Sequence, residues 1–274
     1  MDLALYQSGQ IKYLMKKNNL IHLLVIILIT NLFCGKAYSA SKDLLKIDWS
    51  FAGITGKFER DSLQRGYQVY KEVCASCHSM QYLSYRNLGQ KGGPEFTLEE
   101  VKAIAASYEV EDGPNNDGDM FTRPARPSDH FVNPYPNVNA AIASNGGAYP
   151  PDMSVLVKAR PGGANYIYSV LMGYEEKPTD FDLDVGVYYN KYMDGNKIKM
   201  PSPLSDDLIE YTDGTNATQA QMAKDVTAFL TWAAEPHLEA RHRTGTKVII
   251  YLIILATLVY FSMKKIWSRV DAEK

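Results

Sequence analysis

The chain has 274 residues and a formal net charge of −2, and 46% of its residues are hydrophobic. This length allows one large domain, or two small ones, together with targeting segments. The charge is unevenly spread, because residues 41–240 hold 18 Lys and Arg against 28 Asp and Glu, a net charge of −10. Such an acidic body argues against a nucleic-acid-binding protein, which needs a basic face, and favours a basic protein partner.

Residues 1–39 have the composition of a secretory signal peptide. A pair of lysines precedes an apolar run at 20–33, and small residues with the spacing of a cleavage site follow it. Met15 directly precedes the two lysines, so it is an alternative start of the true coding sequence. The absence of arginine from this segment favours a bacterial secretory route over a mitochondrial presequence.

Apolar residues at three- and four-residue spacing predict a helix from about Ser62 into the motif Cys74-Ala-Ser-Cys77-His78. Gly66 in this helix would allow the close approach of a second helix. The motif predicts a covalently attached c-type haem, because both thiols can bond one porphyrin and the imidazole can bind its iron. A zinc site would need a second ligand pair, and a thioredoxin-like pair would need a βαβ setting.

Capping-box patterns predict two further helices, one beginning at Thr97 and one at Thr218. The second carries an apolar stripe that we expect to pack on the first helix of the domain. Between them, residues 108–204 are rich in proline, glycine and aromatic residues and poor in helical periodicity. This composition predicts long, irregular but ordered loops that wrap around a large flat group such as haem.

A six-coordinate haem iron needs a ligand opposite His78. Met200 is well placed, because it lies far downstream and Pro201 stiffens the segment that follows it. His130 remains an alternative, whereas Met80 is too close to His78 in sequence to reach the opposite face. Ligation by His and Met would raise the reduction potential relative to a nitrogen-rich site.

The last predicted element is a membrane anchor at 247–267. It contains a run of uncharged residues at 248–263 that would span about 24 Å as a helix, and flanking lysines and Trp267 can extend this reach. Together with the signal peptide, this run predicts a periplasmic domain at 40–246 and a cytoplasmic tail at 268–274.

Several ordered blocks of this chain resemble the cytochrome c1 family, the haem subunits of ubiquinol–cytochrome c reductase, the cytochrome bc1 complex. The blocks lie at residues 65–80, 145–152, 158–166, 188–190, 199–201, 213–215, 223–226 and 229–236. The haem motif alone occurs in many families, but this ordered set, followed by a membrane helix, is highly specific.

The resemblance implies one haem c, bound covalently to Cys74 and Cys77, with His78 and Met200 as axial ligands. It also implies a haem pocket, in which Arg160 approaches a propionate. The remaining pocket residues would be Asn145, Pro151 and Tyr166. The expected fold is mainly α: a c-type cytochrome domain with long irregular loops and one C-terminal transmembrane helix.

The function implied by the resemblance is electron transfer without bond chemistry on this chain. Electrons would come from the Rieske iron–sulfur protein and pass to a basic acceptor cytochrome c, in a dimeric complex that also contains cytochrome b. The chain would cross the bacterial cytoplasmic membrane once, with its haem domain in the periplasm. The alternatives are a haem c subunit of a terminal oxidase or nitric oxide reductase, a haem enzyme or gas sensor with an open iron position, and a purely structural anchor.

Overall fold

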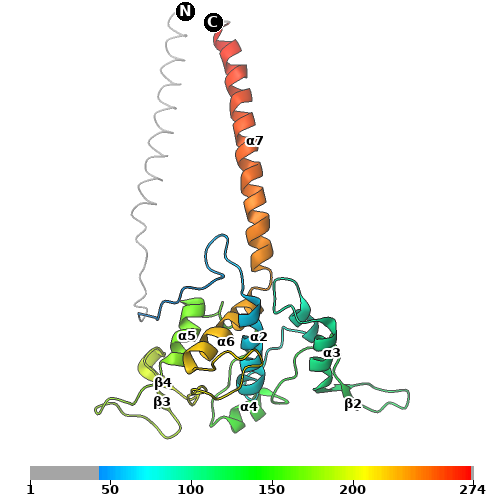
Figure 1. Ribbon diagram of the computed structural model, residues 1–274, viewed down its shortest axis with the longest axis vertical. Helices are drawn as coiled ribbons and strands as arrows, with labels where there is room; N and C mark the ends of the chain where they lie inside the picture. The colour runs from blue at the N-terminus through cyan, green and yellow to red at the C-terminus, as the bar shows by residue number, and fades with distance from the viewer. Residues whose placement is uncertain (1–42, 273–274) are drawn as a thin grey trace, which may run out of the picture. The chain divides into compact units, whose positions relative to one another are not determined.

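The computed structural model describes residues 43–272, so the predicted signal peptide lies outside the described residues (Figure 1). The α-helices are α2 (Arg60–Val69), α3 (Leu98–Ala106), α4 (Val138–Ser144), α5 (Gly163–Met172), α6 (Gln219–Ala234) and α7 (Leu238–Ala272). The shorter helical segments are the π-helix η1 (Tyr70–Cys74) and the 3-10 helices η2 (Tyr85–Gly89) and η3 (Asp194–Asn196). Two antiparallel hairpins pair β1 (Glu109–Asp112) with β2 (Phe121–Pro124) and β3 (Tyr188–Tyr189) with β4 (Lys197–Ile198). The predicted mainly α fold is confirmed.

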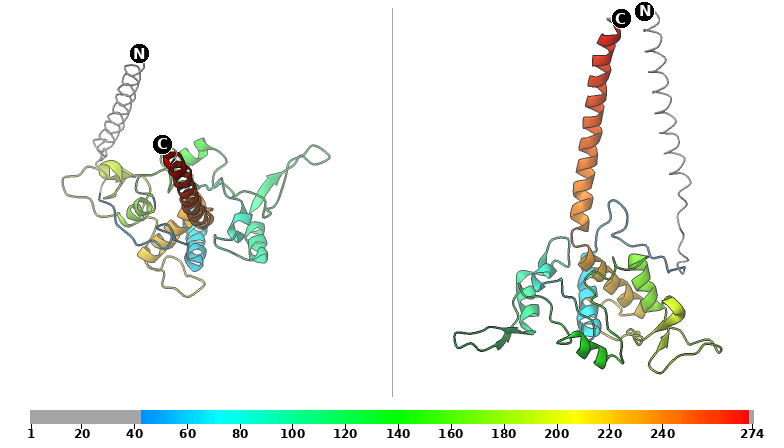
Figure 2. Two further views of the ribbon diagram at one scale, coloured as in Figure 1. Left: turned by 90° about the horizontal axis from the view of Figure 1, so that it is seen from above. Right: turned by 180° about the vertical axis from the view of Figure 1, so that it is seen from behind.

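Helix α6 packs against α2, as the sequence predicts (Figures 1 and 2). The two backbones meet at Gly66, where an added Cβ atom would lie 2.1 Å from the carbonyl oxygen of Asp225. Around this crossing, the ring of Phe229 lies between Tyr67 and Tyr70, with ring centroids 5.7 and 5.9 Å apart. The approach that Gly66 permits therefore brings the aromatic core of the domain together.

A buried carboxylate fastens the same two helices. Asp225 of α6 is fully buried and accepts hydrogen bonds from Ser62 (2.7 Å) and from the guanidinium of Arg65 (2.8 Å), both on α2. Arg65 donates a second bond to the same carboxylate at 3.2 Å, and Gln221 of α6 donates to it at 2.9 Å. A buried charge is tolerated only when its oxygens are satisfied in this way, so these donors make the crossing specific.

Both predicted helix starts are confirmed, but their caps differ. At α3 the box is complete, because Thr97 accepts from the backbone N–H of Glu100 while the Glu100 carboxylate accepts from that of Thr97. At α6 Thr218 accepts from the backbone N–H of Gln221 at 3.2 Å. The Gln221 side chain turns instead to Asp225, so only half of this second box forms.

The segment expected to be irregular contains more regular structure than its composition suggests. Helices α4 and α5 and both hairpins lie in or at the edge of residues 108–204. Helix α5 begins after Gly162, which has a left-handed backbone conformation and provides no side-chain cap. The sequence therefore contains no capping pattern that predicts the start of this helix. Its apolar residues are buried against α6, and this tertiary packing stabilises the helix.

Three residues, one of them Pro236, separate the end of α6 from the start of helix α7. It starts well before the predicted span at 247–267 and runs through it without a break. Residues 238–269 are long and apolar enough to cross a membrane, with a mean hydropathy of 2.0 over the most apolar window. Within the part of the chain that the structure describes, this is the one helix with these properties, which supports a membrane-anchored protein.

The first turns of α7 are tied to the domain. Glu239 accepts two hydrogen bonds of 2.8 Å from the guanidinium of Arg60 and a third, at 2.9 Å, from the backbone N–H of Phe58. His242 donates through Nδ1 to the carbonyl oxygen of Gly56 at 3.0 Å. These contacts join the membrane helix to the start of α2.

We predict that Gly66→Ala destabilises the domain by roughly 1–3 kcal/mol, the usual range for overpacking a core, because the added methyl group meets the α6 backbone. Denaturant unfolding of the purified protein measures the loss. The matched control is Gly245→Ala in α7, where a Cβ meets no atom within 4 Å. Equal stability of the two variants would contradict the close packing at Gly66.

Candidate functional site

The Cys74–His78 motif lies at the end of α2, where the helix widens. The backbone N–H of Ala75 donates to the carbonyl of Tyr70, five residues back, and that of His78 donates to the carbonyl of Cys74 at 2.9 Å. The motif is therefore a compact turn rather than an extended loop. Cys74 and Cys77 are free thiols and half-buried, as haem attachment requires.

His78 is buried and its ring is held by a loop from another part of the chain. Nδ1 lies 2.9 Å from the carbonyl oxygen of Pro151, and because a carbonyl only accepts, Nδ1 carries the proton. Burial lowers the pKa of His78, outweighing this hydrogen bond and the charge of Asp152. The ring is thus neutral and its Nε2 lone pair is available to a metal.

The environment of Cys74 argues against a redox-active cysteine pair. Burial, with a contribution from Cys77, raises the pKa of the Cys74 thiol to about 12. The attacking cysteine of a catalytic dithiol has the opposite property, a lowered pKa that provides thiolate at neutral pH, so Cys74 is not suited to that role. Free thiols beside a neutral, oriented imidazole instead fit a haem held at this motif.

Asp152 fixes the residues that follow His78. Its carboxylate accepts from the hydroxyl of Ser79 at 2.7 Å and from the backbone N–H groups of Gln81 and Ser154, both at 2.9 Å. Burial opposes ionisation here, but these donors hold the pKa of Asp152 below its ordinary value. Asp152 therefore locks the motif to the loop that contains Pro151.

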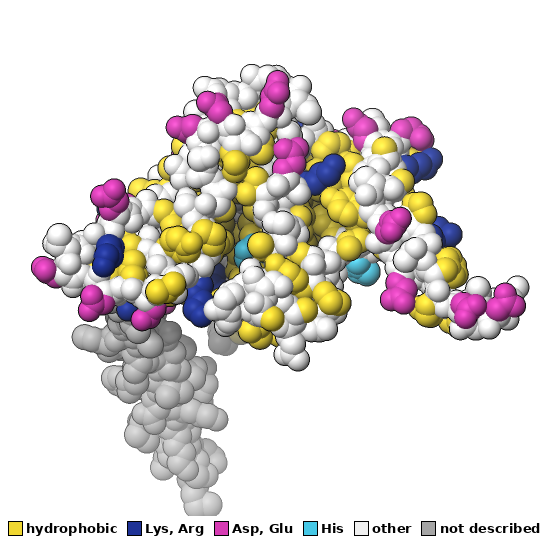
Figure 3. Space-filling model, turned by 90° about the horizontal axis from the view of Figure 1, so that it is seen from below, with side chains coloured by type: hydrophobic (Ala, Val, Ile, Leu, Met, Phe, Trp, Pro, Cys, Tyr) yellow, Lys and Arg dark blue, Asp and Glu magenta, His cyan; other side chains and the backbone are white. Residues whose placement is uncertain are grey.

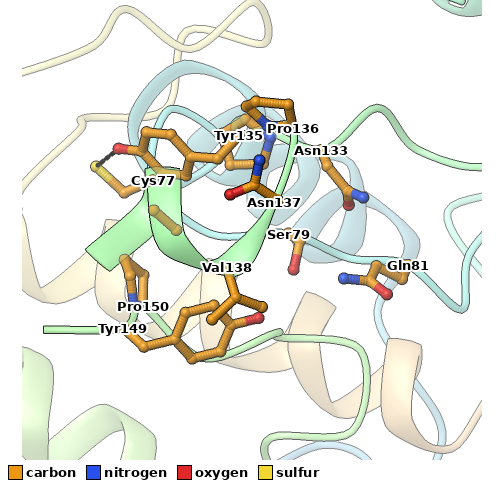
Figure 4. A pocket seen from close by; sticks show the side chains of 12 residues that line it. Cys77, Ser79, Gln81, Asn133, Tyr135, Pro136, Asn137, Val138, Tyr149 and Pro150 are labelled. Carbon is orange, nitrogen blue, oxygen red and sulfur yellow. Dashed lines mark hydrogen bonds between the residues drawn. The ribbon is translucent and has the colours of Figure 1, made fainter. Parts of the chain in front are cut away.

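A pocket opens beside Cys77 (Figure 4). Its lining includes Ser79, Tyr135, Val138, Tyr149 and Pro150. The Tyr135 hydroxyl points at Cys77 and lies 3.9 Å from its sulfur, and it accepts a hydrogen bond of 3.1 Å from Asn145. Asn145 thus reaches the haem motif through Tyr135, a residue that the sequence reasoning did not assign to the site.

Met200 lies on a segment that two contacts hold in place. Tyr174 donates its hydroxyl to the Met200 carbonyl at 3.0 Å, and Lys199 donates to the carbonyl of Gly146 at 2.9 Å. Residues 145–152 consequently contact both the haem motif, through Pro151, and the Met200 segment, through Gly146. Segments about 120 residues apart in sequence are joined by this one loop.

The other two predicted pocket residues lie together. Arg160 is exposed and donates to the neighbouring carbonyl of Ala159, while the half-buried Tyr166 donates to the sulfur of Met193 at 3.2 Å. Burial raises the pKa of Tyr166, and the nearby positive charge of Arg160 opposes this rise. Among the described residues, the hydrogen bonds of this pair go to Ala159 and Met193 and not to Cys74, Cys77 or His78.

A mainly helical domain that presents a Cys-x-x-Cys-His turn, and that continues into a helix able to span a membrane, defines a membrane-anchored cytochrome. The sequence profile of the Cytochrome C1 family matches residues 49–270 of this chain. The chain therefore belongs to the cytochrome c1 family, the haem-binding electron-transfer subunits of the cytochrome bc1 complex, whose other subunits include cytochrome b and the Rieske protein.

Individual relatives agree with this assignment. The chain is 46% identical over 252 residues to cytochrome c1 of Rhodospirillum rubrum, covering 86% of this chain and 92% of that protein. It is 49% identical over 226 residues to the mitochondrial heme protein cytochrome c1-2 of Solanum tuberosum, covering 82% and 86%. It is also 52% identical over 239 residues to cytochrome b/c1 of Bradyrhizobium diazoefficiens, covering 80% of this chain but only 35% of that longer protein.

Proposed function

We propose that the chain holds one haem c and passes electrons from the Rieske iron–sulfur protein to a basic acceptor cytochrome c. Cys74 and Cys77 would hold the porphyrin through thioether bonds, with His78 and Met200 as the axial ligands. The bound haem would supply a one-electron iron couple. No bond chemistry would occur on the chain itself.

The observation that carries this proposal is the state of His78. A buried, neutral imidazole, oriented by Pro151 and directly adjacent to two free thiols, is suited to bind iron rather than to transfer protons. The loop at 145–152 supports Met200 as the second ligand, because it links the haem motif to the Met200 segment. By contrast, Nδ1 of His242 donates to the carbonyl oxygen of Gly56 near the start of α7, and the side chain of His130 is exposed.

Four further elements belong to the proposal. Asn145, Pro151 and Tyr166 would line the haem pocket, and Arg160 would lie near a propionate. The haem domain at 40–246 would lie in the periplasm of a bacterium after removal of residues 1–39, with the tail at 268–274 in the cytoplasm. The complex would be dimeric. Under this proposal the haem domain would lie at the outer surface of the cytoplasmic membrane.

The acceptor would dock on an acidic surface. On the face in Figure 3, acidic side chains lie mainly towards the edges, and hydrophobic side chains gather nearer the middle. One group of acidic residues lies on the β1–β2 hairpin and the other on the loop at 175–184. The first contains Glu109, Glu111, Asp112, Asp117 and Asp119, and the second Glu175, Glu176, Asp180, Asp182 and Asp184. Arg123 pairs with Asp112, the last residue of β1, and also with Asp129, so Asp112 adds little to the net negative charge of the hairpin.

Met200→Leu should lower the reduction potential by on the order of 0.1–0.3 V, within the roughly 0.8 V range that axial ligands control, because the thioether ligand is lost. Reduced Met200→Leu protein should also bind carbon monoxide readily at the open position. Redox titration and carbon monoxide difference spectra measure both effects. Met153→Leu, at a buried methionine outside the proposed ligand set, is the control. An unchanged spectrum and potential in Met200→Leu would refute the ligand assignment.

The electron donor is tested on the complex purified gently from membranes through a tag on this chain. A reduced quinol is added, and the absorption of this haem is followed with and without an inhibitor of the quinol-oxidising site. Fast, inhibitor-sensitive reduction with a co-purifying cytochrome b is expected. Absence of quinol reduction despite intact partner subunits would refute the proposal and favour an oxidase-type haem subunit.

Electron transfer to a basic cytochrome c should slow about tenfold as ionic strength rises from roughly 0.01 to 0.15 M, because salt screens a body of charge −10. Stopped-flow rates measure this dependence. Paired variants identify the docking group: Asp117→Asn with Asp119→Asn at the hairpin tip, against Asp180→Asn with Asp182→Asn on the other loop. A rate independent of salt would contradict acidic docking.

A further inference from the structure

The segment that contains Met200 has little regular structure of its own. It follows the two-residue strand β4 and leads into Pro201, and the residues after Pro201 form no helix or strand before α6. The main-chain carbonyl of Met200 is nevertheless held, because the hydroxyl of Tyr174 donates to it at 3.0 Å. Tyr174 and Met200 are 26 residues apart in sequence. The hydrogen bond therefore holds the Met200 segment through a residue that lies outside that segment.

Tyr174 is itself rigidly placed. It follows Gly173 at the end of α5 and forms an isolated antiparallel bridge with Asn190. Asn190 is fully buried and donates to the carbonyl of Val170 at 2.8 Å, while the backbone N–H of Lys191 donates to the carbonyl of Gly173 at 2.9 Å. The hydroxyl is therefore presented from the end of a helix that packs on the core.

Gly173 makes this junction tight. A Cβ there would lie 2.5 Å from the ring of Tyr192 and 2.8 Å from the side-chain oxygen of Asn190. The β3–β4 hairpin consequently sits directly against the end of α5, and the Met200 segment starts from a fixed point.

We propose that Tyr174 is a positioning residue for Met200, whose carbonyl it holds so that the thioether stays available as an axial ligand. The inference rests on the proposed role of Met200 in binding haem iron. Lys199, through its bond to Gly146, is the second contact on the same segment. When the Tyr174 hydroxyl is removed, Met200 keeps its sulfur but the segment can move away from the haem more often.

The test is Tyr174→Phe in the full-length holoprotein, which keeps the ring and removes one oxygen. Loss of one neutral hydrogen bond should raise the population of the displaced segment roughly five- to tenfold. Carbon monoxide binds only when the methionine has left, so its affinity for the reduced protein should rise by the same factor. The long-wavelength charge-transfer band of the oxidised protein, which reports thioether ligation, should weaken. Covalent haem content should equal that of the wild type.

Tyr188→Phe is the matched control, because Tyr188 is an exposed tyrosine on β3 of the same hairpin. If Tyr174→Phe behaves like Tyr188→Phe in both measurements, the inference is overturned. The inference is also overturned if Tyr174→Phe fails to accumulate as folded haem protein while Tyr188→Phe accumulates normally. The hydroxyl would then be needed for the stability of the whole domain and not for the position of Met200.

Met200→Leu separates this inference from the proposed function. If Met200→Leu leaves carbon monoxide binding and the charge-transfer band unchanged, Met200 is not the ligand and the proposed haem ligation fails. If Met200→Leu changes both while Tyr174→Phe changes neither, the ligation stands and only the positioning role of Tyr174 fails.

Discussion

The close approach of α2 and α6 at Gly66 determines where the haem motif lies, because the motif follows α2 through a single π-helical turn. Two kinds of interaction stabilise the crossing. Aromatic packing around Phe229 is non-directional, whereas the hydrogen bonds to Asp225 require one relative position of the helices. A buried carboxylate without these donors would cost several kcal/mol, so any sliding of α2 along α6 is strongly opposed.

The site is then completed by loops whose order comes from long-range hydrogen bonds. Asp152 and Pro151 fix the turn that contains His78, and the same loop reaches Lys199 through Gly146. These contacts are hydrogen bonds, which are directional and specify geometry more strictly than packing alone. A domain with short helices can in this way hold a large flat cofactor between irregular segments.

The elements with local signals could be predicted from the sequence. The N-caps Thr97 and Thr218, the permissive Gly66 and the apolar stripe of α6 each depend on residues within one or two turns of one another. The haem motif is equally local. Helix α5 could not be predicted, because its stability comes from packing on α6 and its start at Gly162 has no side-chain cap.

The partners within the site escaped prediction for a related reason. Tyr135, Asp152 and Tyr174 act on residues 58, 73 and 26 positions away, and no pattern of spacing in an irregular segment encodes such pairings. Met200 was predicted because its proline neighbour is local and because the family resemblance supplied its role. The structure adds what supports the Met200 segment, which a single sequence does not contain.

The ties between Arg60, Glu239 and His242 have a mechanical consequence. A domain that is joined to a membrane helix by a flexible connection can rotate about it. Here α7 is instead hydrogen-bonded to Arg60, the first residue of the helix that leads to the haem motif. Arg60 and Cys74 are 14 residues apart, so the motif is held about 20 Å along the helix from Arg60. A redox group at the motif would therefore keep a nearly constant distance from the start of α7. Under the proposed function, this chain would not move to collect electrons from a quinol dissolved in the membrane. A mobile partner would have to cover that distance.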